Sequence, residues 1–183
     1  MNKIAAENAI RDLLIAIGEN PHRGELKKTP ERVAEFLKSI VDAKKDIKNV
    51  LQITHNIKHD EMVVVKDVPF YSLCEHHLLP FFGKCHLAYI PENNRVVGIS
   101  RLAEAVDIMS KNFQVQERLT TDIANAIMKH LKPKGVGVVI EGRHLCMEMT
   151  GMKQPDTKII TSAVRGIFRT DIKTREEFLK LIR

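Results

Sequence analysis

The sequence has no tryptophan, only two tyrosines and no long apolar run among its 183 residues. Nucleic-acid-binding surfaces often combine a basic stripe with interleaved aromatic side chains; this chain has no such stripe, so we expect no nucleic-acid partner. A membrane-spanning helix needs about 20 consecutive apolar residues, so none is predicted and we expect no membrane partner. Acidic residues interrupt the apolar pattern at the N-terminus, which is not typical of a signal peptide. We therefore expect a cytoplasmic protein.

Cysteine is also scarce, with only Cys74, Cys85 and Cys146 present. An odd number of cysteines in a chain that we expect to be cytoplasmic argues against a disulfide framework. The thiols are then either buried or metal ligands. Cys85 lies in a strand-like run, so we expect it in the core.

The net charge of +6 favours contacts with anions, including phosphates. Within residues 23–48 the basic residues alternate with acidic ones, which is typical of a solvated helix surface. Since 44% of the residues are hydrophobic and 28% are charged, the chain suits one globular domain with a small appendage. We expect a helical N-terminal segment over residues 1–50 and the main domain over residues 51–183.

Apolar periodicity predicts helices over residues 4–17, 101–112 and 116–131. A further helix is expected to begin at Thr29, with Thr29 as its N-cap, because Pro30 suits the first helical position. Ser100 is the expected cap of the helix over 101–112. Thr174 and Glu177 form a capping-box pattern at the start of a final helix.

The strands are predicted from β-branched and alternating apolar runs. Because short turns join neighbouring runs, antiparallel pairing and an α+β fold are favoured. The sheet looks too one-sided to bury both of its faces, so an oligomer is expected. The predicted strands cover residues 62–70, 84–91, 135–141, 144–149 and 158–168.

The first candidate site is the segment Cys74-Glu75-His76-His77. A Cys-x-x-His spacing lets a thiolate and an imidazole reach one tetrahedral metal ion from a single turn. The alternative interpretation is a buried cysteine beside two surface histidines.

The second candidate site is the segment from His144 to Thr150. If this segment is a strand, His144, Cys146, Glu148 and Thr150 share one face and the apolar residues share the other. The alternative is a free cysteine in the core and a histidine with satisfied hydrogen bonds.

Two cysteines and one histidine from the two segments make three ligands, which leaves a fourth position for water, as in catalytic zinc sites. Zinc would lower the pKa of that water, and a remaining histidine would move protons.

The third candidate site is Gln116-Glu117-Arg118, at the start of the helix over 116–131. The carboxylate of Glu117 can accept two hydrogen bonds from the N1–H and 2-amino edge of a guanine. The alternative is an acid placed in a first helical turn, where the helix dipole favours it. The spacing alone favours this structural alternative.

These segments resemble the GTP cyclohydrolase I family. The resemblance runs from about residue 20 to the end of the chain in family order. It implies a tunnelling fold, in which subunits with antiparallel sheets and helices on one face assemble into a ring-shaped barrel, usually a decamer. The implied reaction converts GTP and water to 7,8-dihydroneopterin triphosphate and formate, the entry to folate or tetrahydrobiopterin synthesis. The matching stretches are TPERV, SLCEHHLLPFFGKCHLAYIP, VVGIS, QVQERLT, GVGVVIEGRHLCMEM, TSAVRGIF and TREEF.

The resemblance also implies a role for individual residues. Cys74, His77 and Cys146 correspond to the zinc ligands, and His144 and His76 to the acid/base groups. The substrate contacts implied are Glu117 and Gln116 on the guanine and Ser100, Arg101 and Arg32 on the triphosphate.

Three positions depart from the family pattern, and two of them, Glu104 and Thr150, weaken attraction for a polyanion. Glu104, Thr150 and Glu35 stand where many members have a basic residue. Each lost charge-assisted phosphate contact costs on the order of 1.5–3 kcal/mol, unless Lys153 or Arg165 compensates. Two alternatives therefore stay open: a related purine-ring hydrolase for a less phosphorylated substrate, and a zinc-stabilised ring without catalysis.

Overall fold

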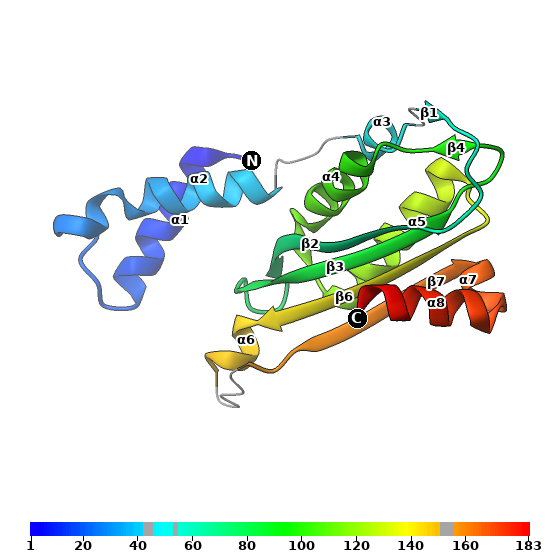
Figure 1. Ribbon diagram of the computed structural model, residues 1–183. Helices are drawn as coiled ribbons and strands as arrows, with labels where there is room; N and C mark the ends of the chain where they lie inside the picture. The colour runs from blue at the N-terminus through cyan, green and yellow to red at the C-terminus, as the bar shows by residue number, and fades with distance from the viewer. Residues whose placement is uncertain (42–45, 53–54, 151–155) are drawn as a thin grey trace. The chain divides into compact units, whose positions relative to one another are not determined.

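The computed structural model describes residues 1–41, 46–52, 55–150 and 156–183. By its internal contacts the chain divides into two compact units, Met1–Lys44 and Lys45–Arg183 (Figure 1). Helix α3 (Ile47–Val50) belongs to the second unit, where Val50 is buried in the core. The domain boundary expected after residue 50 stays a prediction. In the described ranges, no helix has both the length and the hydropathy needed to cross a bilayer.

The first unit contains two helices joined by a 3-10 turn. Helix α1 (Lys3–Ala16) confirms the predicted first helix, and the side chain of Asn2 caps it by accepting from the backbone amide of Ala5. Helix α2 (Thr29–Val41) follows η1 (Gly24–Lys28) directly. The prediction of Thr29 as an N-cap is wrong, because its φ of −62° and ψ of −43° are already helical.

The second unit is built on a five-stranded sheet in the order β5-β2-β3-β6-β7. All of its neighbours pair antiparallel except β2 and β5, which pair in parallel. A two-stranded sheet of β1 (His55–Asn56) and β4 (Arg95–Val96) lies apart from it. The α+β class is thereby confirmed. The strands are β2 (Val63–Cys74), β3 (Pro80–Ile90), β5 (Phe113–Gln114), β6 (Gly135–His144) and β7 (Ile159–Gly166).

Two long helices, α4 (Ile99–Ser110) and α5 (Gln116–Leu131), cover one face of this sheet (Figure 1). Alternate residues of β3, among them Cys85 and Leu87, pack into this larger core. The prediction of Cys85 as a core residue is confirmed, since it is fully buried and burial raises the pKa of its thiol to about 12. The short α7 (Ile167–Thr170) and α8 (Ile172–Ile182) pack over part of the opposite face through a smaller core.

The predictions of Ser100 and Thr174 as N-caps are also wrong, because each residue already lies inside its helix. Helix α4 begins two residues earlier than expected, so its N-cap is Gly98 and Ser100 lies within the first turn. In α8 the cap is Asp171, whose carboxylate accepts from the amides of Lys173 and Thr174. In both helices the chain enters the helix upstream of the residue whose type suggested a cap.

The strand predicted over residues 144–149 is also wrong. Strand β6 ends at His144, and one helical turn, α6 (Leu145–Glu148), follows it. His144 pairs with Phe81 on β3, and the next β3 residue in that direction is Pro80, which has no amide hydrogen to continue the ladder. His144, Cys146, Glu148 and Thr150 therefore do not share a strand face.

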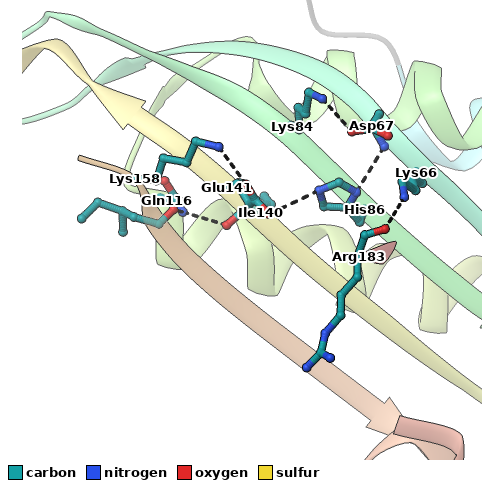
Figure 2. Close-up of polar contacts among 10 residues, drawn as sticks. Lys66, Asp67, Lys84, His86, Gln116, Ile140, Glu141, Lys158 and Arg183 are labelled. Atoms are coloured by element: carbon teal, nitrogen blue, oxygen red, sulfur yellow. Dashed lines mark hydrogen bonds and ion pairs between the residues drawn. The ribbon is translucent and has the colours of Figure 1, made fainter. Parts of the chain in front are cut away.

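On the sheet face opposite to α4 and α5, a buried histidine fills a bulge in the neighbouring strand. The register between β2 and β3 shifts next to Asp67, whose backbone has a φ of 61°. The amide of Asp67 donates to Nδ1 of His86 at 3.2 Å (Figure 2). The side chain of Asp67 in turn accepts from Lys84 at 2.8 Å.

The other ring nitrogen of His86, Nε2, has no hydrogen-bond partner in the described part of the chain, and Glu141 Oε1 lies 3.9 Å away. Burial lowers the pKa of His86; Asp67 and Glu141 raise it by less, and Lys66 and Lys84 lower it further. The imidazole is thus held neutral, with its proton on Nε2 because Nδ1 accepts the Asp67 amide.

The lowered pKa of His86 makes the protein less stable in mild acid. Below about pH 6.5 an unfolded histidine binds a proton that buried His86 does not, so stability falls as the pH drops from about 6.5 toward the folded pKa. We expect His86→Asn, whose Oδ1 can still accept the Asp67 amide, to lose less thermal stability than the parent between pH 7.5 and pH 5.5. The control is His22→Asn at an exposed position. Equal losses in all three proteins would contradict the assignment.

Candidate active site

The turn between β2 and β3 carries the first cysteine and two histidines. Cys74 is the last residue of β2, its amide donates to Leu79 O at 2.8 Å, and its carbonyl accepts from Leu78 N at 2.8 Å. Leu78 has a φ of 56°, which reverses the chain into β3. This tight turn brings Nδ1 of His77 to 3.9 Å from Sγ of Cys74.

The second cysteine, Cys146, lies on α6 directly after β6. This helical turn is held by Glu148, whose carboxylate accepts two hydrogen bonds from Arg143 at 2.9 and 2.8 Å. As a result, the ligand atoms of Cys74, His77 and Cys146 all lie within 4.8 Å of one another. The sequence prediction that these three residues converge is borne out by their positions.

The donor set and its spacing fit a zinc ion. Bond lengths of about 2.3 Å to sulfur and 2.0–2.1 Å to nitrogen place tetrahedral ligand atoms about 3.3–3.8 Å apart. This range is close to the 3.9 Å between Sγ of Cys74 and Nδ1 of His77. Burial and the nearby Cys74 thiol raise the pKa of Cys146. Two thiolates this close repel each other, so both ionise only beside a cation. Three protein ligands leave a fourth position open, as in catalytic zinc sites.

The three potential ligands form one wall of a cavity of about 230 Å³. The cavity also contains both of the predicted acid/base residues and both of the predicted guanine contacts. Four segments distant in sequence therefore meet at one end of the sheet. The lining residues are Cys74, His76, His77, Gln114, Val115, Gln116, Glu117, His144, Cys146, Met147 and Ile159.

His144 is held rigidly within this cavity. Its ring stacks on that of Phe81, with centroids 4.7 Å apart and planes at 5°. Its Nε2 lies 2.9 Å from Oε1 of Gln116. Burial lowers the pKa of His144, and the nearby carboxylate of Glu117 offsets part of this effect. The ring is therefore neutral and fixed in direction.

The first turn of α5 supplies two neighbouring side chains with different surroundings. Gln116 is buried, and its Nε2 donates to the carbonyls of Ile140 (Figure 2) and Ile159 and to Oγ1 of Thr161. Glu117 is exposed and lines the cavity with its carboxylate. The guanine contact expected of Glu117 stays a prediction that fits this position. The same contact expected of Gln116 would require its amide to give up partners within the protein.

An ion pair that the sequence patterns did not suggest joins the two main motifs. The guanidinium of Arg118 binds the carboxylate of Glu75, with Nη1 3.4 Å from Oε1, and also donates to Oε1 of Gln114 at 2.7 Å. It thereby ties the turn that carries the metal ligands to the start of α5. Only the spatial adjacency of the two motifs could have revealed it.

The residues expected at the triphosphate lie outside the cavity lining. Arg101 and Ser100 are exposed on α4, and Nη1 of Arg101 forms an ion pair with Glu104 at 2.9 Å. Arg32 and Glu35 belong to the first unit, where Glu35 pairs with Lys3 at 2.9 Å. The triphosphate roles of Ser100, Arg101 and Arg32 stay predictions.

Of the two residues expected to compensate for missing cations, only Arg165 lies in the described part of the chain. Arg165 donates to Oδ1 of Asn125 at 3.0 Å. Lys153 lies outside the described residues. Thr150, where many family members have arginine, donates its hydroxyl to the carbonyl of Cys146.

Removing a ligand from the proposed zinc site should abolish metal binding. We expect Cys146→Ala and Cys74→Ala to purify with less than about a tenth of the zinc of the parent, because two remaining ligands bind zinc far more weakly. Metal content is measured by mass spectrometry of the purified protein. Cys85→Ala is the matched control: it should keep its zinc, since Cys85 is buried away from this site. Retention of zinc by Cys146→Ala would contradict the ligand assignment.

Comparison with known proteins places this geometry in context. The sequence profile described as GTP cyclohydrolase I matches residues 6–183. The "GTP cyclohydrolase 1" of Thermoanaerobacter pseudethanolicus is 51% identical over 183 residues, which cover 100% of this chain and 97% of the relative. The protein of the same name from Caldanaerobacter subterraneus subsp. tengcongensis is 50% identical, with the same coverage.

A third relative, from Pelotomaculum thermopropionicum and also named "GTP cyclohydrolase 1", is 52% identical over 178 residues, covering 97% of this chain and 95% of the relative. These identities extend over nearly the full length, so they include the sheet, both long helices and all the cavity segments. Together with the α+β architecture they confirm the tunnelling-fold subunit expected from the sequence. The chain belongs to the GTP cyclohydrolase I family.

Proposed function

We propose that the protein hydrolyses and rearranges GTP to 7,8-dihydroneopterin triphosphate and formate, with one water consumed overall. The observation that carries the proposal is the meeting, in one cavity, of the Cys74–His77–Cys146 group, the fixed imidazole of His144 and the carboxylate of Glu117. Family membership supports the same reaction. A metal group alone would not distinguish this chemistry from other hydrolyses.

The residues can be given complementary roles in this reaction. When bound, zinc supplies a Lewis acid that makes water a nucleophile near neutral pH. Glu117 accepts hydrogen bonds from N1–H and the 2-amino group of guanine, which turns C8 toward the metal side of the cavity. His144 transfers the proton that accompanies cleavage of the C8–N9 bond. A second water then cleaves the C8–N7 bond to release C8 as formate, and closure of the new ring returns one water, so one water is consumed overall. His76 lies on the same cavity and is the second acid/base candidate.

The phosphate end of the substrate is proposed to lie toward α4. Ser100 and Arg101 occupy the first turn of that helix, where backbone amides favour an anion. Arg32 is proposed to contribute a further cation. The carboxylate of Glu104 competes with phosphate for Arg101, because it already forms an ion pair with that side chain.

We propose further that the working form is a ring-shaped homo-oligomer, most simply the decamer of the family. The face of the sheet opposite to α4 and α5 carries exposed apolar side chains on two strands, Tyr71 at 68% and Ile160 at 64% exposure. A second copy would bury such residues. A cytoplasmic location is also proposed, since all three thiols are free.

Turnover of GTP tests the proposed function. We expect zinc-loaded protein to release formate from GTP and to form a pterin that fluoresces after oxidation. We expect His144→Ala to lower kcat by about 10²–10⁴, the usual contribution of a positioned acid/base group. His130→Ala, at the far end of α5, is the control and should keep normal activity. Absence of turnover at saturating GTP in the unmodified protein would reject the proposal and favour a ring without catalysis.

Removing the ion pair between Arg101 and Glu104 should strengthen binding of the GTP triphosphate. We expect Glu104→Arg to lower KM for GTP about tenfold or more, because it removes a carboxylate and adds a cation near the phosphates. The change in KM for GMP should be smaller, and the two are compared by the formate assay. Glu92→Arg, which makes the same charge change away from α4, is the control. If the parent protein preferred GMP or guanosine over GTP, the second candidate function, a hydrolase for less phosphorylated purines, would be favoured.

A further inference from the structure

A polar cluster extends from the wall of the cavity into the protein, and the proposed reaction assigns a role only to its His144. It consists of His144 at the end of β6, Gln116 and Thr120 on α5, and Thr161 on β7. Gln116 and Thr120 are both 1% exposed. Buried polar groups at this depth are costly unless each hydrogen bond is made, so the directions of their hydrogen bonds can be worked out.

The orientation of the Gln116 amide is determined by two carbonyl groups. The atom assigned as Nε2 lies 3.1 Å from Ile140 O and 2.9 Å from Ile159 O. Carbonyl oxygens only accept hydrogen bonds, so the atom between them must be the nitrogen. A flipped amide would place its own oxygen against two others. Oε1 of Gln116 therefore faces His144.

This orientation decides which ring nitrogen of His144 carries the proton. Nε2 of His144 lies 2.9 Å from Oε1 of Gln116, which is an acceptor. The imidazole must donate to it, so a neutral ring has its hydrogen on Nε2 and its lone pair on Nδ1. Within the described residues, Nδ1 of His144 has no hydrogen-bond partner and remains available for proton exchange.

Two threonines complete the cluster and hold the amide in place. Oγ1 of Thr120 donates to the backbone carbonyl of Gln116 at 2.7 Å. Oγ1 of Thr161 lies 2.6 Å from Oγ1 of Thr120 and 3.1 Å from Nε2 of Gln116. Since the Thr120 hydroxyl donates elsewhere, Thr161 must donate to it. The two hydrogens on Nε2 of Gln116 are then shared among three acceptors, which are Oγ1 of Thr161 and the carbonyls of Ile140 and Ile159. Every hydrogen in the chain of contacts then has an acceptor.

A glycine on β6 makes room for the contact between Gln116 and His144. A Cβ atom at Gly142 would lie 2.2 Å from Oε1 of Gln116 and 3.6 Å from Nε2 of His144. Any side chain at this position would therefore push the amide away from the imidazole. The stacked ring of Phe81 restricts the same imidazole from its face.

We propose that Gln116 is a positioning residue, which acts on the reaction by fixing the tautomer and direction of His144 rather than by binding guanine. The proposal rests on the proposed function of His144 as the acid/base group. It assigns the proton exchange with substrate to Nδ1 and gives Thr161 a supporting role through the amide of Gln116. It also separates the roles of the adjacent residues Gln116 and Glu117, of which only Glu117 contacts the base.

The test compares Gln116→Met with the parent protein and then repeats the change in a His144→Ala background. We expect Gln116→Met to lower kcat about ten- to hundredfold, with KM for GTP within about twofold of the parent. In the His144→Ala background the same change should lower the residual rate by less than about twofold, because the group on which it acts is gone. If Gln116 instead binds guanine, Gln116→Met should raise KM for GTP. It should also lower the rate by the same factor in the His144→Ala background as in the parent. Either result would overturn the proposal.

Two further measurements support the test. GTP binding is measured without turnover, and substitutions of Thr161 disturb folding less than a change at Gln116. GTP affinity of His144→Ala should be the same with and without Gln116→Met; a tenfold weaker Kd would overturn the proposal. Thr161→Val should lower kcat at constant KM, and Thr161→Ser, which keeps the hydroxyl, should restore it. Equal kcat in these two variants would also overturn the proposal. Zinc content is measured in each protein, and inactivity of the parent would count against the proposed function instead.

Discussion

The site depends on a short distance between three side chains that are far apart in the sequence. Cys74 ends β2 and Cys146 follows the end of β6, and both strands pair with β3. Leu73 lies opposite Pro80, and His144 lies opposite Phe81. The register of one central strand therefore brings the two thiols together, and a change of register by two residues would move them about 7 Å apart. The position of the candidate metal site, and with it the proposed position of the substrate, follows from this pairing.

Helix α5 adds the second half of the site because its first turn points toward the same end of the sheet. Consecutive residues on a helix lie about 100° apart, so Gln116 turns into the protein and Glu117 turns to the cavity. The pair Glu75–Arg118 joins this turn to the segment with the metal ligands. A rigid framework of this kind is what a multistep reaction in one cavity requires, since the same groups must meet successive intermediates.

Much of this fold could be predicted from local patterns, because helices and strands leave periodic apolar traces. Helices α1 and α5 and strands β2, β3, β6 and β7 lie where periodicity placed them, within a few residues. Caps were predicted less well at Thr29, Ser100 and Thr174, because several nearby residues could serve and the path of the chain decides among them. The strand expected after His144 was wrong, since only the pairing with β3 shows that the ladder ends at Pro80.

The chemistry of the site was predictable in part for similar reasons. The Cys-x-x-His spacing and the second cysteine are visible in the sequence, so the metal group could be named. The hydrogen bonds of Gln116 join residues up to 45 positions apart and leave no local trace. X-ray absorption at the zinc edge of the purified protein tests the central claim most directly. The account predicts two sulfur ligands at about 2.3 Å with two nitrogen or oxygen ligands at about 2.0–2.1 Å. A shell without sulfur, or one with four sulfurs, would contradict it.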